Sequence, residues 1–463
     1  MSTARTEPIA PVTSRRDELR RLMRLAGPVM IAYLGTISMG TIDTVMAGRL
    51  GPAALGSVAL GHTWGIAVAI VAYGAARVLD PIVAQAYGAG DAKAAGLGLS
   101  RGLAMMAILS VPVLALYATA RVGLTLLGQP AELVPDAGAY CLMLVPGMPA
   151  ILAFVVVRNF LQAIGLVRPA TYAILLANVA NALLNGIFMY GWLGFPSLGV
   201  VGCALSTAIG QWLMLGSIVL FARGTLRAYW PGWKGAFAWG PLSPMLRLGL
   251  TLGLQFGVEV WAFHAAGFMM GRLGAVAFAA HAVAINLATI SFMLPSGVGV
   301  AAATRVGNLV GAGLPWGRSA AMAIGLGAAI VALPAIVFVA AARPLAAVYT
   351  RDAAVIAVAA VIIPLAGAFQ LFDGTQAVTT GILRGIGDTR TPMVMNVIGH
   401  WVLGLPVGYA LCFWFAWGVA GLWIGLSIGL IFCAVALTAT WIARTRHLEL
   451  PPGTHPTEPM ELI

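Results

Sequence analysis

Three of the fifteen acidic residues stand inside long apolar runs of the chain: Asp43, Glu259 and Asp373. The charges nearest to Glu259 are Arg247, twelve residues before it, and Arg272, thirteen residues after it. Near the midplane of a bilayer such a charge costs about 2.5–3.5 kcal/mol on insertion scales. A carboxylate in that position therefore calls for a wet cavity, a proton or a bound cation.

Two buried carboxyl groups that share a cavity favour the protonated form of one another, whereas a nearby cation favours the ionised form. A proton and a cationic ligand would then compete for the same carboxylates, which is the thermodynamic basis of antiport. Both acids of the second half lie in stripes of polar residues on one helical face: Thr251, Gln255 and Glu259; and Gln370, Asp373, Gln376 and Thr380. Because lipid offers no hydrogen bonds, each stripe must face other helices or a water-filled cavity. A purely structural, hydrogen-bonded pair of carboxyls is the alternative.

The composition places these residues in a membrane protein. Apolar residues make up 60% of the chain, charged residues 9%, and the mean hydropathy is +0.94. A helix needs about 20 largely apolar residues to cross a bilayer. The uncharged runs predict an all-α polytopic protein with twelve transmembrane helices, over residues 22–48, 54–80, 98–121, 135–157, 169–192, 199–222, 245–270, 276–303, 319–342, 356–383, 392–414 and 418–443.

The net charge of +11 does not indicate a nucleic-acid site, because the positive residues are distributed unequally between the two sides of the predicted spans. Of the 26 Lys and Arg residues, twenty fall on the side of the membrane that holds both termini. The opposite side holds five, and Arg77 lies near a helix end. Since positively charged loops stay in the cytoplasm, we expect both termini there. The basic segment 1–21 is expected to be a retained cytoplasmic arm and not a cleaved signal peptide, and residues 444–463 a cytoplasmic tail.

The chain repeats itself at a spacing of about 223 residues. "VMAGRLG" at 45–51 recurs as "FMMGRLG" at 268–274, and "LQAIGLVRP" from 161 as "LRGIGDTRTP" from 383. We therefore expect two six-helix lobes, 22–222 and 245–443, joined by a cytoplasmic linker at 223–244. An even number of spans gives both lobes the same orientation, a transporter design whose substrate site lies near mid-bilayer where the repeats meet.

The duplication does not duplicate the acids. A residue that the scaffold alone requires would be expected in both lobes, so the three acids indicate a division of labour. The aligned pairs are Glu259 with Thr36, Asp43 with Ala266, and Asp373 with Ile151.

Five stretches along residues 20–445 resemble the multidrug and toxic compound extrusion (MATE) family, in its NorM-type branch: "TIDTVMAGRLG", "DPIVAQAYGAGD", "RNFLQAIGLVRP", "ATRVGNLVGAG" and "LRGIGDTRTP". The resemblance implies two six-helix bundles around a V-shaped cleft. It also implies export of organic cations, driven by inward flow of protons or sodium ions.

The same resemblance assigns residues to a site. "FGVEVWAFH" and "FQLFDGTQ" are similar to the segments with the family's acidic pair, here Glu259 and Asp373, with Gln255, Gln370 and Gln376 in support. Asp43, Asn181 and Asn185 resemble its amino-terminal cation site, to which Thr207 adds a hydroxyl. For these residues a buried polar network between helices is the alternative. Trp261, Phe263 and Phe369 are candidates for stacking on a flat cation, and core packing or lipid contact is the favoured alternative at any single position.

The coupling ion is open between a proton and sodium at Glu259 and Asp373. Sodium-linked members of the family often carry a tyrosine where this chain has Phe369, and the missing hydroxyl favours protons because hard cations need oxygen ligands. The four cysteines, Cys141, Cys203, Cys412 and Cys433, are expected to pack as small apolar residues.

The sequence shows no nucleophile paired with a base, no cluster of metal ligands and no phosphate-binding loop. It therefore gives no indication of an enzyme, a cofactor or a structural metal. We therefore expect a monomeric exporter of small organic cations in the bacterial inner membrane. A lipid-linked oligosaccharide flippase is the main alternative, although its pyrophosphate cargo would need arginines at the centre. A passive channel would not need unmatched central acids.

Overall fold

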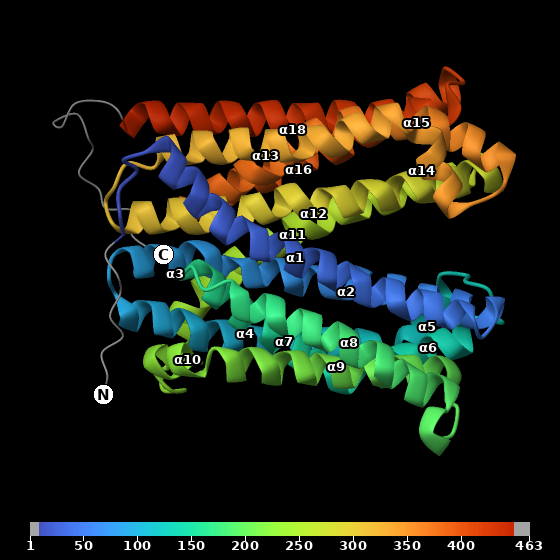
Figure 1. Ribbon diagram of the computed structural model, residues 1–463, viewed down its shortest axis with the longest axis horizontal. Helices are drawn as coiled ribbons and strands as arrows, with labels where there is room; N and C mark the ends of the chain where they lie inside the picture. The colour runs from blue at the N-terminus through green and yellow to red at the C-terminus, as the bar shows by residue number, and fades with distance from the viewer. Residues whose placement is uncertain (1–8, 449–463) are drawn as a thin grey trace. The chain divides into compact units, whose positions relative to one another are not determined.

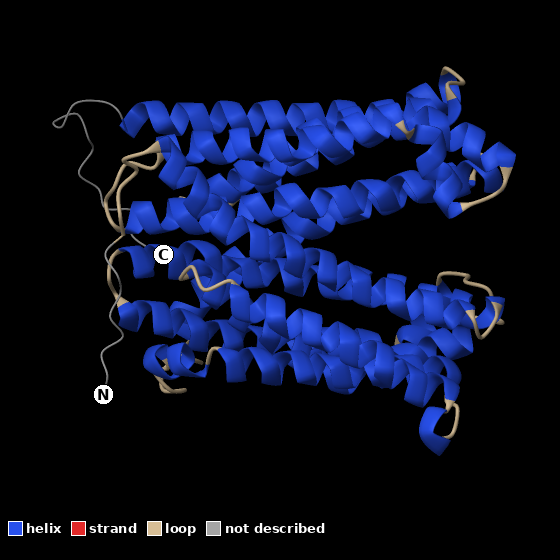
Figure 2. Ribbon diagram, viewed as in Figure 1, coloured by secondary structure: helices blue, strands red, loops and turns tan. Residues whose placement is uncertain are grey.

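The computed structural model describes residues 9–448, and every regular element in that range is a helix (Figure 2). Within residues 9–448, eleven helical segments are long and apolar enough to cross a membrane. The twelfth predicted span coincides with α11 (Trp239–Gly271), which has 33 residues and lies outside that set. Its polar side chains, Gln255, Glu259 and His264, lower its hydropathy, so the residues of chemical interest are also those that weaken the membrane signal.

The remaining elements of the first half of the chain follow one another with short connections (Figure 1). They are α1 (Arg15–Gly48), α2 (Pro52–Ala75), the 3₁₀ turn Ala76–Val78, α3 (Leu79–Gly88), α4 (Ala92–Ala118), α5 (Ala120–Leu126), α6 (Val134–Leu144), the 3₁₀ turn Val145–Gly147, α7 (Met148–Ala163), α8 (Arg168–Tyr190), the 3₁₀ turn Trp192–Gly194, α9 (Gly199–Phe221) and α10 (Arg223–Tyr229).

After α11, the second half repeats this order with longer unbroken helices. They are α12 (Ala275–Gly311), α13 (Gly317–Ala340), α14 (Ala342–Tyr349), α15 (Ala353–Gly385), α16 (Arg390–Asn396), the π-helical segment Val397–Gly404, α17 (Leu405–Tyr409), the π-helical segment Ala410–Trp414 and α18 (Gly418–Leu448).

The backbone repeats the duplication seen in the sequence. The segment 52–88 of the first half and α12 at 275–311 share the shift of 223 at both ends. Each begins after a glycine with a positive φ, Gly51 at 118° and Gly274 at 106°, which an L side chain rarely adopts. A proline or small residue then starts the helix. The same turn therefore opens the same span in both halves.

The described residues form two compact units that exchange the beginning of the first helix. Among the described residues, one unit contains 31–253 and the other contains 9–30 and 254–448. Leu22, Ala26 and Met30 of α1 are buried against Val298 and Ile382 of the second unit. The boundaries thus lie within α1 and α11, and not in the predicted linker 223–244, which belongs to the first unit.

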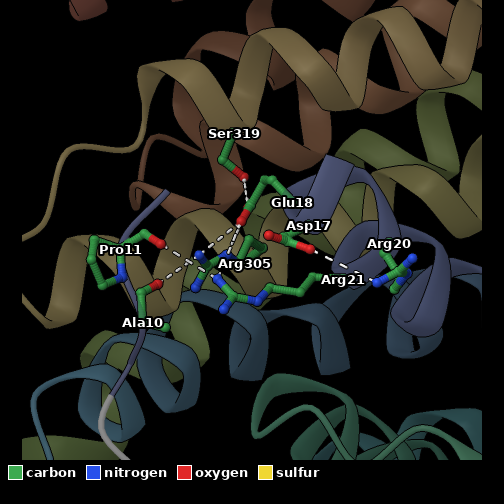
Figure 3. A network of polar contacts seen from close by, with 8 residues as sticks. All are labelled: Ala10, Pro11, Asp17, Glu18, Arg20, Arg21, Arg305 and Ser319. Carbon is green, nitrogen blue, oxygen red and sulfur yellow. Dashed lines mark hydrogen bonds and ion pairs between the residues drawn. The ribbon is translucent and has the colours of Figure 1, made fainter. Parts of the chain in front are cut away.

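A buried polar network fastens the beginning of α1 within the second unit (Figure 3). The Arg305 guanidinium donates from Nε to Glu18 Oε1 at 2.7 Å and from Nη2 to Glu18 Oε2 at 2.9 Å. Ser319 Oγ donates to Glu18 Oε1 at 2.7 Å, and Arg305 Nη2 also donates to the Ala10 carbonyl at 2.8 Å. Glu18 is 1% exposed, so part of the predicted arm 1–21 is a buried component of the fold.

Glycines bring α18 and the segment before it into backbone contact within the second unit. Gly425 of α18 lies against the backbone of Gly408 in α17, and Gly429 lies against the Gly399 carbonyl of the π-helical segment. Any side chain at these positions would meet backbone atoms. Close packing of this kind is how small residues associate membrane helices.

We expect Gly425→Ala to lower the free energy of unfolding by about 1–3 kcal/mol, the range for overpacking a filled site. Gly216→Ala in α9 is the matched control because nothing lies within 4 Å of a Cβ built there, and alanine is the better helix former. Thermal unfolding of the purified full chain checks both. Equal melting temperatures for the two variants would contradict the packing argument.

Candidate functional site

The first unit gathers four predicted residues into one buried hydrogen-bonded cluster around Asp43. Asn185 Nδ2 donates to Asp43 Oδ1 at 2.7 Å, and Thr207 Oγ1 donates to Asp43 Oδ2 at 2.8 Å. Asn181 Nδ2 donates to Thr207 Oγ1 at 3.2 Å, and Asn185 Nδ2 also approaches Asn181 Oδ1 at 3.4 Å. Asp43 is 4% exposed and both asparagines are 0% exposed. The carboxylate from α1 is thus held by donors from α8 and α9.

The cluster follows from helical spacing. Asn181 and Asn185 are one turn apart, so both face the same neighbour, and α8 packs along α9, which carries Thr207 (Figure 1). Asn185 Oδ1 is buried and has no hydrogen-bond partner among the described residues. The cluster therefore presents a carboxylate together with an amide oxygen that can still accept from a proton donor or bind a cation.

We expect Thr207→Val to lower the free energy of unfolding by about 1–3 kcal/mol, because a nearly isosteric change leaves a buried carboxylate oxygen without its donor. Thr63→Val is the control, since the Thr63 hydroxyl bonds only the Ala59 carbonyl of its own helix at 2.9 Å and is exposed. Thermal unfolding of the purified protein measures both. A loss at position 207 no larger than at position 63 would argue against a tightly held cluster.

The second unit brings Glu259 of α11 and Asp373 of α15 close enough to interact electrostatically. Asp373 is 5% exposed, whereas Glu259 is partly exposed. The acids predicted to form a pair therefore share one region, with Asp373 as the inner member and Glu259 as the more accessible one. Glu259 makes further interactions of its own.

Polar side chains of the stripes around this pair form hydrogen bonds with neighbouring helices. Gln370 Nε2 donates to the Ala288 carbonyl at 2.9 Å, and Gln376 Nε2 donates to Asn396 Oδ1 at 2.7 Å. Both glutamines are buried, and the side-chain oxygen of each has no partner among the described residues. Gln255 is also buried. Gln370 and Gln376 position α15 against α12 and α16 and leave acceptor oxygens on the buried side.

The three predicted aromatic contacts differ in their surroundings. Phe369 is 2% exposed and packs edge-on against Phe263 and Trp423, with ring centroids 5.9 Å apart in each case. Phe263 also contacts the buried His400 ring at 5.8 Å. Phe263 and Trp261 are only partly buried. Phe369 is therefore a core residue in this conformation, whereas the other two retain accessible surface.

Sequence reasoning missed several residues beside the acids. Cys433 lies near Glu259 and Asp373, and Cys203 lies beside Asp43; both thiols are buried, as predicted for small packing residues. Asn396 receives Gln376, and Trp401 Nε1 donates to the Val258 carbonyl at 2.9 Å, directly before Glu259. An asparagine and a tryptophan within an apolar span were the available signals, but no spacing linked them to the acids.

Known proteins match this chain along almost its entire length. The MatE family model matches residues 28–187 and again 252–410. A probable multidrug resistance protein NorM from Mesorhizobium japonicum is 35% identical over 449 residues, covering 94% of this chain and 96% of that protein. The multidrug resistance protein MdtK of Edwardsiella ictaluri is 33% identical, covering 92% and 96% of the two chains.

Solved structures agree on the fold. A eukaryotic MATE transporter aligns with a TM-score of 0.86 at 22% identity, covering 94% of this chain and 98% of that one. An outward-facing multidrug resistance MATE family transporter aligns with a TM-score of 0.82 at 20% identity, covering 93% and 96%.

The helices, the duplication and the two buried acidic groups define a multi-pass membrane protein with the fold of a secondary transporter. The match of the family model to both halves and the sequence identity to full-length relatives also show which family the chain belongs to. The chain belongs to the MatE (MATE) family.

Proposed function

We propose that this protein is a multidrug exporter that moves organic cations outward in exchange for inward protons or sodium ions. The observation that carries the proposal is the pair Glu259 and Asp373, two carboxyl groups that interact inside one unit of a membrane-spanning fold. Relatives named as multidrug resistance proteins in several bacteria support the same activity.

The chemistry rests on charge neutralisation. An ionised carboxylate inside a membrane domain is costly unless a partner balances it. A proton bound to the pair makes it neutral, and a cationic drug bound there balances it instead. Because one site serves both ligands in turn, the binding of either favours release of the other, and alternating access converts that competition into exchange.

We assign the substrate pair to Glu259 and Asp373, and a second ion-binding group to Asp43 with Asn181, Asn185 and Thr207. Partly exposed Trp261 and Phe263 offer ring faces to a flat cation. Gln255, Gln370 and Gln376 hold the surrounding helices. Protons are favoured over sodium at the second-unit pair because the neighbouring Phe369 supplies no oxygen ligand. No other cofactor is part of the proposal.

The relatives from bacteria favour the inner membrane as the location. Together with the distribution of Lys and Arg, this supports both termini in the cytoplasm, and the proposal takes the transporter as a monomer. The lipid-linked oligosaccharide flippase finds no support, because the central charges of both units are carboxylates and not arginines.

Reconstituted protein in liposomes tests the function. We expect the wild type to move ethidium against its gradient when the lumen and bath differ in pH, or in sodium concentration if sodium couples. Equilibration of the dye without accumulation under either gradient would show a passive pathway. Movement of a labelled pyrophosphate-linked lipid, with none of the dye, would support the flippase.

A further inference from the structure

The connector between the two halves is a built part of the first unit. Tyr229, at the end of α10, is 8% exposed and packs edge-on against Phe160 at 5.6 Å. Gly96 of α4 lies against the Tyr229 carbonyl, where any side chain would collide. Ala236 and Leu242 are also buried in the core of this unit. These contacts fix the conformation of residues 223–242.

The outer side of the same connector carries four exposed aromatic residues. Trp230 is 38% exposed, Trp233 54%, Phe237 56% and Trp239 64%. Three of their rings form a continuous row, with Trp230 and Trp233 in edge contact at 5.1 Å and Trp233 stacked on Phe237 at 6.2 Å. An apolar surface of this kind, held open by a rigid backbone, marks an interaction site.

Positive charge surrounds the aromatic row. Arg223, Arg227 and Lys234 are all exposed, and the sequence from residue 137 to residue 258 contains no Asp or Glu. Such a surface complements an anionic partner.

The position of the connector identifies the anionic partner. It begins two residues after α9 (Gly199–Phe221), one of the candidate membrane spans, ends, and α10 packs beside the ends of α4 and α9 (Figure 1). Tryptophan side chains concentrate at the level of lipid headgroups, and basic residues there attract anionic lipids. Aromatic rings and cations on one rigid segment therefore match a charged bilayer surface.

We propose that residues 223–239 form a preorganised docking surface for anionic phospholipid headgroups, which anchors the first unit at the membrane interface. The aromatic row enters the headgroup region, and Arg223, Arg227 and Lys234 bind the phosphates. This anchor is independent of the transport site, so it holds whether or not the exported compounds are cations.

Native mass spectrometry of the full chain in detergent, titrated with phosphatidylglycerol or phosphatidylcholine, tests the proposal. Each basic residue near the surface contributes roughly fivefold to the affinity for anionic lipid. We expect the triple variant Arg223→Gln/Arg227→Gln/Lys234→Gln to lose at least about tenfold of the preference for phosphatidylglycerol. Trp233→Ala/Phe237→Ala should weaken binding of both lipids.

The matched control removes three exposed cations of the second unit, Arg318→Gln/Arg343→Gln/Arg390→Gln. It should keep the wild-type preference within about twofold, well under the fivefold change expected for one interfacial cation. Equal losses in both triple variants would overturn the proposal, because they would reveal only a general charge effect. A connector variant with unchanged lipid preference but an altered ratio of dimer to monomer would also overturn it, because a second copy of the chain would then be the occupant.

Discussion

Replacing Asp373 with Asn removes most of the gradient-driven accumulation of an organic cation, and Glu259→Gln has nearly the same effect. Coupling between two ligands is typically worth about 5- to 150-fold in affinity, so we expect accumulation to fall by roughly 10- to 100-fold in each variant. An amide keeps the shape of the carboxyl group and one of its acceptor oxygens, but it neither binds a proton nor balances a cation. Dye accumulation in proteoliposomes under an imposed pH gradient measures the loss.

Glu132→Gln is the control for this experiment, because Glu132 is an exposed acid outside both clusters. It should accumulate dye like the wild type. The thermal unfolding of Asp373→Asn should also stay near that of the wild type, because the amide has nearly the same shape as the carboxyl group. Full coupled transport in either acid variant would remove the pair from the mechanism, even though the family assignment would stand.

Breaking the Glu18–Arg305 pair strongly destabilises the protein. Arg305→Met leaves the Glu18 carboxylate buried without its bidentate partner, and such changes cost about 3–5 kcal/mol. We expect a clear fall in melting temperature, measured by tryptophan fluorescence of the purified full chain. Asp17→Asn, which removes an exposed pair with Arg20 at 3.8 Å, should change stability by less than about 1 kcal/mol.

The double variant Glu18→Met/Arg305→Met separates two explanations. Replacing a whole buried ion pair with apolar residues is often neutral, so the double variant should recover most of the stability lost in Arg305→Met. A double variant as unstable as the single one would show that the two charges do not act as a pair. Its transport then shows whether the beginning of α1 must stay fastened within the second unit.

Most of the fold was predictable because bilayer physics leaves few choices. Uncharged runs of about 20 residues that cross a bilayer must be helices. The repeated motifs align the sequence of the second half with that of the first. Gly51 and Gly274, which align in the sequence, adopt the same turn. The span that carries Glu259 was predicted from its length, although its polar residues place it outside the clearly apolar set.

The Asp43 cluster was anticipated in its members because Asn181 and Asn185 share a helix face. Which oxygen each donor binds depends on the rotation of three helices, and no spacing encodes that. The sequence likewise could not predict that Phe369 packs in the core, because an aromatic residue beside an acid is equally consistent with a binding surface and with a core.

Glu18 and Arg305 are the sharpest omission. They lie 287 positions apart in the sequence. Glu18 stands in the segment predicted to be a cytoplasmic arm, and Arg305 entered the sequence argument only as one of the positive charges that set the membrane orientation. Residues 9–30 join the second unit because Leu22, Ala26 and Met30 pack there. That packing is a long-range property which periodicity along one helix does not reveal.

Proton release on substrate binding tests the central claim most directly, because it asks whether drug and ion compete for the same carboxylates. Purified wild-type protein in weakly buffered detergent solution is mixed with ethidium, and the pH is followed. We predict that binding acidifies the solution, or displaces sodium if sodium is the coupling ion, and that Asp373→Asn does neither. Dye binding by the wild type without release of either ion would contradict the account.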